Sequence, residues 1–562
     1  MRSNPEQTAK PAREAVPGFF ERASFFVRSN GLKAREFARS RPAPPLRIGS
    51  EIDFPLVLVE SRTPLIPAHD DHPMFVCGKI QNLRLACARI HRKTVARGQE
   101  FRFWREIGPP WALRGYVTGR EIREGCVIPT IGGGLCQLSG SLHEVALGAG
   151  CRITERNRHT YRLAGVDLPD RRDATVFWNY VDLRWVAERD VLLEAYLEPD
   201  TLVVRLRGRD LPANASREDA PAASAPARAL NNCYECGQHN CPRSVAAEKS
   251  ARRKEERSSA ALLEAFQPEI LRAAGSPDRI FVPRRSAYGS RARSFDFTSY
   301  RSALAWRLRA GKKIAATQAI ERAADLARAY SRALPSTCDT LFVTQDLAPH
   351  LWRLGALGGR RYRIFLQRPS FADMHDRLDR AALLYPEAES LREFRAPVDL
   401  VADELHALAH AAELITAHAD LARAFHLPSP APWIAPVTTP ATLAGTRDSL
   451  LFPGPTAARE GAFAVRELAR ATGLKVLALG PNLEGPGFWT EVEAPACTRD
   501  TIPWERVTAL VHPTLHESWP RLHLEALARG IPVIATAACG LPASPGLRIV
   551  SFGERLPSEN FL

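Results

Sequence analysis

The chain has 562 residues, of which 45% are hydrophobic and 25% are charged, a composition typical of soluble globular domains. This length predicts about three to four domains. The net charge of +14 comes mostly from arginine and suits anionic sugar nucleotides or an anionic membrane face. Nucleic acid is the weaker candidate partner, because the arginines are not interleaved with aromatic residues as they are in single-strand binders.

The sequence predicts neither a signal peptide nor a membrane-spanning helix. Charges occur throughout the amino-terminal segment MRSNPEQTAKPAREAVPGFFERASFF, which therefore does not match a signal peptide. No later stretch approaches the roughly 18 uninterrupted apolar residues of a membrane-spanning helix. These features predict a cytoplasmic protein, and the basic charge leaves a peripheral contact with the inner membrane face open. The 11 cysteines then predict thiols or metal ligands in place of a disulfide framework.

The first predicted domain follows a basic, proline-punctuated lead-in over residues 1–48, which we expect to be flexible. Residues 49–208 predict an α+β module with a helical start and a sheet at its end. The strands are indicated by alternating apolar and polar residues in DATVFWNYVDLRWV, VLLEAYL and TLVVRLRG.

A cysteine in this module has the sequence context of a reactive thiol. Three glycines, Gly132 to Gly134, end a coil, and Cys136 opens the predicted helix CQLSGSLHEVALGAG, where the helix dipole favours a thiolate. His159 follows, and then Asp173 and Asp182, all on predicted strands. This order predicts Cys136 as nucleophile, His159 as base and Asp173 or Asp182 as its orienting group, as in papain-like and transglutaminase-like sites. The alternative is a tight glycine turn followed by a small buried cysteine.

The stretch from about Phe101 to Gly208 resembles the VanW family. The residues that carry the resemblance are Gly115, Tyr116, Gly119, Arg120, Gly132 to Gly134, Leu135, Cys136, Gln137, Glu155, Arg156, His159, Asp173 to Val176, Asp182 and Leu183. That family is linked to vancomycin-resistance gene clusters, and its biochemical activity is not established. The resemblance therefore implies a family without implying a reaction.

A cysteine knuckle follows an Ala/Pro-rich linker predicted over residues 209–232. Cys233 and Cys236 have C-x-x-C spacing, and His239 and Cys241 come shortly after them. Two thiolates at this spacing share one tetrahedral metal, so the knuckle predicts a zinc or iron–sulfur site. The fourth ligand is then His239, a distant residue or a substrate. A redox pair or a chance cluster is the alternative.

The remainder of the chain predicts a helical connector and then two α/β halves. The segment 233–336 holds the knuckle and an arginine-rich stretch that we expect to be helical and largely solvated. Strands and helices alternate over 337–432 and again over 433–562, which is typical of parallel sheets.

Two glutamates stand out in the last half, within VHPTLHESWPRLHLEALARGIPVIAT. This segment predicts a strand end, a loop, an amphipathic helix and a second strand. Glu517 falls in the loop and Glu525 eight positions later in the helix. Beyond the carboxyl end of a strand, both would face the crevice in which open α/β sheets bind ligands. The alternative is two unrelated surface glutamates.

The spacing and flanks of these glutamates resemble the E-x7-E segment of retaining GT-B glycosyltransferases, which are built from two Rossmann-like halves. The resemblance implies that Glu525 binds the ribose of a nucleotide-sugar and that Glu517 lies beside the donor. It also implies that Arg459 holds the donor diphosphate. Glu460 stands where that family often has a lysine, and the segment Glu517 to Pro520 lacks the usual glycines. A carboxylate beside phosphates is unfavourable, so either Glu460 points away or donor binding is weakened.

The predicted protein is multidomain: an α+β VanW-like module, then an α/β GT-B-type half with two Rossmann-like domains. We expect a bacterial retaining glycosyltransferase of the hexosyl type, which moves a sugar from a nucleotide-sugar to a glycan or lipid-linked acceptor of the cell envelope, or to a polysaccharide. One alternative is a thiol hydrolase or transpeptidase with Cys136 as nucleophile. The other is a non-catalytic scaffold with a structural metal in the knuckle.

Overall fold

The structure is a computed structural model of the whole chain. It describes residues 31, 46–66, 73–123, 126–159, 162–163, 169–178, 180–210, 227–228, 231–232, 257–264, 267–283, 292–294, 315–392, 395–428, 430–434 and 447–556. The chain divides into two compact units, residues 1–256 (unit 1) and 257–562 (unit 2). Within the described residues, no helix has the length and apolarity to cross a bilayer. The knuckle residues Cys233, Cys236, His239 and Cys241 lie outside the described residues, as do most of the predicted lead-in and linker.

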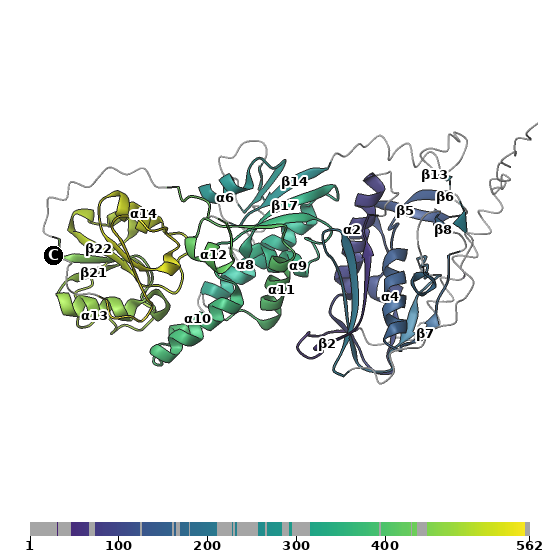
Figure 1. Cartoon of the computed structure of the whole chain (residues 1–562), viewed down its shortest axis with the longest axis horizontal. Coiled ribbons are helices and arrows are strands. Elements are labelled where there is room, and N and C mark those ends of the chain that lie inside the picture. The colour runs from purple at the N-terminus through teal and green to yellow at the C-terminus, as the bar shows by residue number, and fades with distance from the viewer. Residues whose placement is uncertain are drawn as a thin grey trace, which may run out of the picture. The chain divides into compact units, whose positions relative to one another are not determined.

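Unit 1 is built on a five-stranded antiparallel sheet in the order β1-β3-β10-β11-β2 (Figure 1). Its strands are β1 (Arg47–Ile48), β2 (Leu56–Pro64), β3 (Lys93–Val95), β10 (Val191–Leu197) and β11 (Thr201–Gly208). Strands β10 and β11 coincide with the two alternating stretches VLLEAYL and TLVVRLRG. Helices α2 (Pro73–Ile90) and α4 (Cys136–Gly148) pack against this sheet and enclose the core of the unit.

Unit 1 also contains smaller antiparallel elements. The hairpin of β5 (Thr118–Arg123) and β6 (Cys126–Ile131) leads into α4, and a three-stranded sheet has the order β4-β9-β7. The strands of that sheet are β4 (Glu100–Arg102), β7 (Arg152–Glu155) and β9 (Arg184–Val186), and the short α3 (Phe103–Ile107) follows β4. Phe101 and Trp185 stack at a ring-centroid distance of 5.0 Å between β4 and β9 and are fully buried.

The stretch DATVFWNYVDLRWV departs from its predicted strand. Only its end is a strand, β9, while Asp173 to Val176 form an irregular segment. The strand prediction is wrong there because the polar groups of this segment bond to the residues that follow β7 and not to a neighbouring strand. The Thr175 N–H donates to the Asn157 carbonyl at 2.7 Å, and the Arg156 guanidinium donates to the Asp173 carbonyl at 3.0 Å. His159 likewise lies after β7 and not on a strand.

The first sheet of unit 2 is parallel and has the order β16-β15-β14-β17-β18-β19. Its strands are β14 (Ser258–Leu262), β15 (Arg279–Val282), β16 (Ala292–Ser294), β17 (Cys338–Thr344), β18 (Arg361–Phe365) and β19 (Glu413–Ile415). The helices of this half are α6 (Pro268–Ala274), α8 (Ala315–Ala333), α9 (Ala348–Arg353), α10 (Phe371–Leu384), α11 (Val398–Ala409) and α12 (Ala419–Ala424).

This sheet corrects the predicted boundary at residue 337 and the predicted all-helical connector. Three of its six strands come before that boundary. The central strand β14 reads SSAAL, which contains no β-branched or aromatic residue. Its pairing with β15 and β17 on both sides makes it a strand in spite of this weak local propensity.

The second sheet of unit 2 is also parallel and has the order β21-β20-β22-β23-β24. Its strands are β20 (Ser449–Phe452), β21 (Lys475–Ala478), β22 (Val507–His512), β23 (Val533–Thr536) and β24 (Leu547–Val550), with helices α13 (Ala462–Thr472) and α14 (Arg521–Ala528). Strands β20, β22 and β23 are buried along their whole length, as expected for a parallel sheet covered on both faces. The predicted alternation of strands and helices is confirmed, and so is the fold class of antiparallel sheets followed by parallel α/β sheets.

The carboxyl ends of the two parallel sheets meet within unit 2. His516 follows β22, and its Nε2 atom lies 2.8 Å from the carbonyl oxygen of Gln367, which follows β18. His418 follows β19, and its Nε2 atom lies 3.1 Å from the Ala538 carbonyl oxygen beyond β23. Ligands of open α/β sheets bind at such carboxyl edges, so this is the region of unit 2 in which to look for a site.

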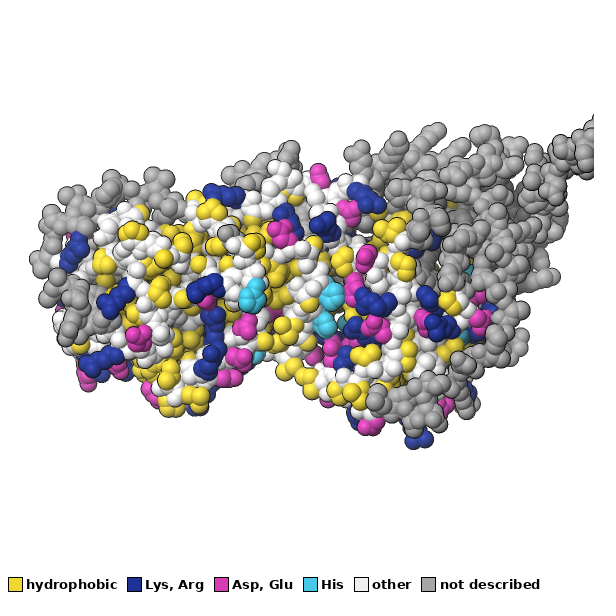
Figure 2. All heavy atoms as spheres, in the orientation of Figure 1, with side chains coloured by type: hydrophobic (Ala, Val, Ile, Leu, Met, Phe, Trp, Pro, Cys, Tyr) yellow, Lys and Arg dark blue, Asp and Glu magenta, His cyan; other side chains and the backbone are white. Residues whose placement is uncertain are grey.

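Charged side chains do not separate by sign on the face shown in Figure 2. There, lysine and arginine are interspersed with aspartate and glutamate, and hydrophobic side chains lie between them. The described side chains in this view therefore show mixed charge and no separate basic area.

Candidate functional site

In unit 1, a glycine loop places Cys136 at the first position of helix α4. The Asn82 side-chain amide donates to the Gly133 carbonyl at 2.9 Å and fixes the loop to α2. A Cβ atom on Gly133 would lie 2.6 Å from the backbone carbon of Gly119, so no larger residue fits there without a shift of the chain. The loop then turns into α4, and the Cys136 thiol lies at the helix N-terminus as predicted.

Cys136, His159 and Asp173 come together as one cluster of side chains. The Nδ1 atom of His159 lies 2.6 Å from Oδ1 of Asp173, and the same oxygen accepts the His159 backbone N–H at 3.0 Å. The Cys136 thiol lies close enough to His159 for the two groups to shift each other's pKa. It also lies 3.4 Å from the Thr175 hydroxyl. Of the two predicted orienting groups, Asp173 is therefore the one that contacts His159.

Asp182 has a structural role. One of its carboxylate oxygens accepts the backbone N–H groups of Trp104 at 3.1 Å and Leu183 at 3.0 Å, and the other accepts from Arg184 at 3.0 Å. Burial raises the pKa of the Asp182 carboxyl to about 6. This carboxyl ties α3 to β9 and does not contact His159.

The charges around Cys136 favour an ion pair of thiolate and imidazolium. Burial raises the pKa of the Cys136 thiol, but the hydrogen bond and charge of His159 outweigh it, and the net pKa is lowered. Burial lowers the pKa of His159, but its bonds to Asp173 and Cys136 raise the net pKa to about 10. By contrast, burial raises the pKa of the Cys151 thiol to about 12. Cys136 is therefore the more acidic of these two thiols, and a lowered thiol pKa is characteristic of reactive cysteines.

The thiol faces a pocket of about 360 Å³. Aromatic side chains form one part of its wall, and glycine backbone and basic side chains form another. The lining residues include Lys79, Trp104, Arg120, Gly132, Gly133, Gly134, Cys136, His159, Thr175, Phe177, Trp178 and Tyr180. A pocket of this size holds a small substrate or the end of a larger one next to the thiol.

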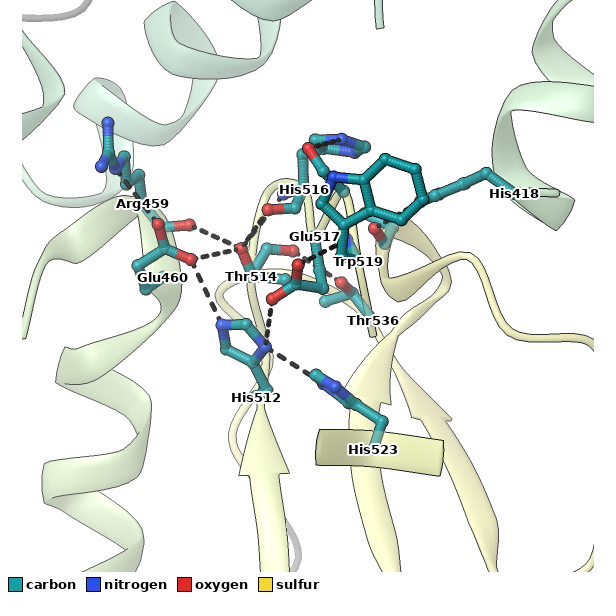
Figure 3. A network of polar contacts seen from close by, with 12 residues as sticks. His418, Arg459, Glu460, His512, Thr514, His516, Glu517, Trp519, His523 and Thr536 are labelled. Atoms are coloured by element: carbon teal, nitrogen blue, oxygen red, sulfur yellow. Dashed lines mark hydrogen bonds and ion pairs between the residues drawn. The ribbon is translucent and has the colours of Figure 1, made fainter. Parts of the chain in front are cut away.

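In unit 2, the turn after β20 packs directly on the loop after β22. Gly461 has a φ of +83°, and a Cβ atom on it would lie 2.4 Å from the Pro513 carbonyl oxygen. This close approach places Arg459 and Glu460 beside the end of β22 (Figure 3). The Glu460 carboxylate lies 3.2 Å from Nε2 of His512 and accepts the Thr514 hydroxyl at 2.9 Å.

The predicted donor residues Arg459, Glu517 and Glu525 come from the turn after β20, the loop after β22 and helix α14. Glu517 accepts the Trp519 backbone N–H through Oε1 at 2.7 Å, and its Oε2 lies 3.9 Å from Nδ1 of His512. Burial raises the pKa of the Glu517 carboxyl. On α14, Glu525 pairs with Arg529 at 2.8 Å, one helical turn away. Arg459 pairs with Glu460 at 3.2 Å.

Several polar residues at the carboxyl edges of unit 2 were not predicted from the sequence. Glu264 follows β14, and burial, together with the charge of Asp346, raises the pKa of its carboxyl to about 8. Gln367 donates to Glu264 at 2.6 Å, and the buried His512 and His523 face each other in the second half. Glu264 would have been found as a polar residue after a strand, had SSAAL been recognised as one. His512 and His523 could have been found in the sequence, because they are metal-ligating residue types that lie close to Glu517 along the chain.

One group of three metal-ligating side chains occurs among the described residues, namely His512, Glu517 and His523. The predicted knuckle ligands Cys233, Cys236, His239 and Cys241 remain a prediction, because they lie outside the described part of the chain.

Comparison with known proteins separates the two units. YoaR of Bacillus subtilis, an uncharacterized protein, is 29% identical over 132 residues, which are 23% of this chain and 43% of YoaR. The vancomycin B-type resistance protein VanW of Enterococcus faecalis is 26% identical over 129 residues, 22% of this chain and 46% of that protein. The chain thus spans less than half the length of these curated relatives.

Solved structures similar to this chain include three with sugar-related descriptions. The lipopolysaccharide outer core galactosyltransferase WaaB is 11% identical, over 52% of this chain and 85% of that one, with a TM-score of 0.29. Sucrose-phosphate synthase from Thermosynechococcus elongatus is 14% identical, over 50% and 82%, with a TM-score of 0.32. A structure described as trehalose-6-phosphate from E. coli, bound with UDP-2-fluoro glucose, is 12% identical, over 50% and 85%, with a TM-score of 0.30.

At these identities and TM-scores, the function of unit 2 has to be argued from its own side chains. The family model for VanW like protein matches residues 78–207, which include the glycine loop, helix α4 and the residues around the Cys136 thiol. Residues 78–207 of this chain are therefore a VanW-like domain.

Proposed function

We propose that unit 2 is a glycosyltransferase that moves a sugar from a nucleotide-sugar donor to a cell-envelope or polysaccharide acceptor. The observation that carries the proposal is the meeting of two parallel-sheet carboxyl edges within one unit. Of the residues assigned to the donor by resemblance, Arg459 lies in the turn after β20 and Glu517 in the loop after β22, at the second of these edges, and Glu525 lies on α14, the helix that follows this loop. A donor held there would present its sugar towards the first edge.

The contacts of Glu460 support the alternative in which its carboxylate points away from the donor diphosphate. Its carboxylate is directed at His512 and Thr514 and pairs with Arg459. The pKa of Glu460 is raised by burial but lowered more strongly by His512, Arg459 and Thr514, so the group is ionised and compensated. A negative charge shared among these partners opposes a diphosphate less than a free carboxylate would.

The remaining roles follow from positions on the edge. Arg459 would hold the diphosphate, Glu525 the ribose hydroxyls and Glu517 the sugar side. We further propose a retaining, hexosyl-transferring reaction, in which positioning and stabilisation of the leaving diphosphate lower the barrier. No protein nucleophile is needed for such a mechanism.

Isothermal titration of the full-length protein with nucleoside diphosphates and sugar nucleotides tests this proposal. Glu525→Gln removes a charge-assisted hydrogen bond to the ribose and should weaken donor binding by about 10-fold to 100-fold. Glu467→Gln is the matched control, because Glu467 is exposed on α13. Equal donor affinities of the wild type and Glu525→Gln would refute the assignment. Absence of binding to any nucleotide would refute glycosyl transfer itself.

A second candidate function, thiol hydrolysis or transpeptidation in the VanW-like domain, is favoured by the Cys136–His159–Asp173 arrangement in its pocket. The thiolate would attack the carbonyl carbon of a peptide-like amide. The His159 imidazolium would give its proton to the departing amine, which leaves a thioester on Cys136. Water or a second amine would then attack the thioester and release the acyl group.

The chain offers internal controls for the thiol function. Brief treatment with iodoacetamide at neutral pH should label Cys136, while Cys151 and Cys87, whose thiol pKa values are raised by burial, should stay unmodified. Peptide mass spectrometry reads the sites directly. Equal labelling of all three cysteines, or labelling that spares Cys136, would exclude an activated thiol. If the wild type shows neither selective labelling of Cys136 nor nucleotide binding, the alternative that remains is a non-catalytic scaffold.

A further inference from the structure

We propose that His512, His523 and Glu517 bind one divalent transition-metal ion of the zinc class. His512 lies at the end of β22, Glu517 in the loop that follows it and His523 on α14 (Figure 3). The site shares Glu517 with the proposed donor site, but metal binding is argued from side-chain geometry alone.

The ligand atoms converge on a space of the size of one ion. Nδ1 of His512 lies 3.1 Å from Nε2 of His523 and 3.9 Å from Oε2 of Glu517, and all three atoms lie within 4.8 Å of one another. Nitrogen and oxygen ligands at about 2.0–2.2 Å from a zinc ion are separated by about 3.3–3.6 Å in a tetrahedral site. A small rotation of the Glu517 carboxyl would bring the set to that spacing.

The hydrogen bonds around His512 direct a lone pair towards this space. Its Nε2 atom faces the Glu460 carboxylate at 3.2 Å, and Glu460 is itself held by the Thr514 hydroxyl at 2.9 Å. A carboxylate accepts from an N–H, so the proton of the neutral ring is on Nε2 and the lone pair is on Nδ1. Metal-binding histidines characteristically donate their second ring N–H to a carboxylate, which orients the ring and increases its basicity. Glu460 is in this sense a positioning residue.

The other two ligands are also held in place. Glu517 uses Oε1 to accept the Trp519 backbone N–H at 2.7 Å, which leaves Oε2 on the side of His512. His523 is 1% exposed, and its Nδ1 atom has no hydrogen-bond partner among the described residues, so the polar contact of this ring is made through Nε2, on the side of the cluster.

Two imidazoles and one carboxylate select the metal class. Imidazole nitrogen suits zinc and its neighbours among the transition metals, whereas calcium and magnesium prefer all-oxygen sites. Three protein ligands leave a fourth position of a tetrahedral ion for water or a substrate oxygen.

The alternative to a metal ion in this cluster is a proton shared by the side chains. In that case the proton lies in a hydrogen bond between Nδ1 of His512 and Nε2 of His523, which are 3.1 Å apart. A proton and a metal ion differ in stoichiometry and spectrum, so one measurement separates them.

The test is a cobalt(II) titration of the full-length protein after treatment with a chelator. The wild type should bind one ion that is lost in His523→Leu, and the lost ion should show visible d–d absorption without thiolate-to-cobalt charge transfer. Any ion held by the cysteine knuckle would show that charge transfer and would persist in His523→Leu. His426→Asn, a change at an exposed histidine of the same unit, should leave the stoichiometry unchanged.

Two further variants guard against a misfolded His523→Leu protein. Glu517→Gln removes a ligand, and Glu460→Gln removes the group that orients His512, which should weaken cobalt binding by about 10-fold to 100-fold. Circular dichroism checks that both remain folded. The proposal is overturned if the wild type and His523→Leu bind the same number of ions with the same spectra, or if Glu517→Gln binds cobalt as tightly as the wild type. Since no nucleotide is present, a failure of donor binding leaves this result unaffected.

Discussion

The thiol cluster of unit 1 and the carboxyl edge of unit 2 are built from similar parts but differ in what their predicted residues contact. In unit 1, Cys136, His159 and Asp173 come from three separate segments and bind one another. In unit 2, Glu517 and Glu525 contact His512 and Arg529, which had not been predicted as site residues. The difference has a chemical reason: an acid, a base and a thiol are complementary to one another, whereas groups of the kind that bind a ligand are complementary to that ligand.

The largest expected effect is a slower alkylation of Cys136 in unit 1 when His159 is replaced. His159→Gln removes the charge and hydrogen bond that lower the thiol pKa of Cys136, and leaves the burial that raises it. The thiolate exists above the thiol pKa, so the alkylation profile should move to higher pH. The rate at pH 7 should then fall about 10-fold for each pH unit by which the profile moves. The rate of iodoacetamide reaction as a function of pH measures this. An unchanged profile would mean that His159 does not activate the thiol.

The next effect concerns Arg459 of unit 2, the proposed ligand of the donor diphosphate. Arg459→Ala should weaken binding of nucleoside diphosphates by about 10-fold, because a charge-assisted contact to phosphate is lost. Binding of the nucleoside alone should not change, because it has no phosphate. Equal losses for the nucleoside and the diphosphate in calorimetric titrations would place Arg459 elsewhere in the site.

A smaller effect distinguishes the two aspartates of unit 1. Asp173→Asn weakens the orientation of His159 and should slow alkylation of Cys136 at pH 7, whereas Asp182→Asn should leave that rate unchanged. The reason is that Asp173 contacts His159, while Asp182 contacts Trp104, Leu183 and Arg184. If Asp182→Asn slowed alkylation more than Asp173→Asn, Asp182 would be the residue that orients His159.

The smallest effect concerns stability and pH. The pKa of Asp182 is about 6 in the folded state, against 3.8 for an ordinary aspartate, so the folded state binds more protons than the unfolded state between these values. Stability of unit 1 should therefore fall as pH rises from 4 to 6, by at most about 3 kcal/mol. Calorimetric unfolding of the wild type and Asp182→Asn compares the two slopes. A wild-type slope as flat as that of the variant would contradict the raised pKa.

The elements that could be predicted are those whose sequence patterns are long or chemically specific. The alternation in VLLEAYL and TLVVRLRG matched β10 and β11, and the glycine run before Cys136 matched a loop that ends at a helix N-terminus. Strand β14 was not predicted, because SSAAL has no local β signal and becomes a strand only between two neighbours. Asp173 to Val176 were predicted as strand, because their side-chain contacts with distant residues are invisible in a local pattern.

The sequence by itself determined that an α+β module precedes an α/β half, that the last two sheets are parallel and that Cys136 opens a helix. These properties depend on local spacing: apolar periodicity, turn residues and the start of a helix. Tertiary structure decided which aspartate contacts His159, how Glu460 is compensated and that His512, Glu517 and His523 share one space. Each of these depends on contacts between segments that are brought together only by packing, and the distance between two side chains cannot be read from their separation along the chain.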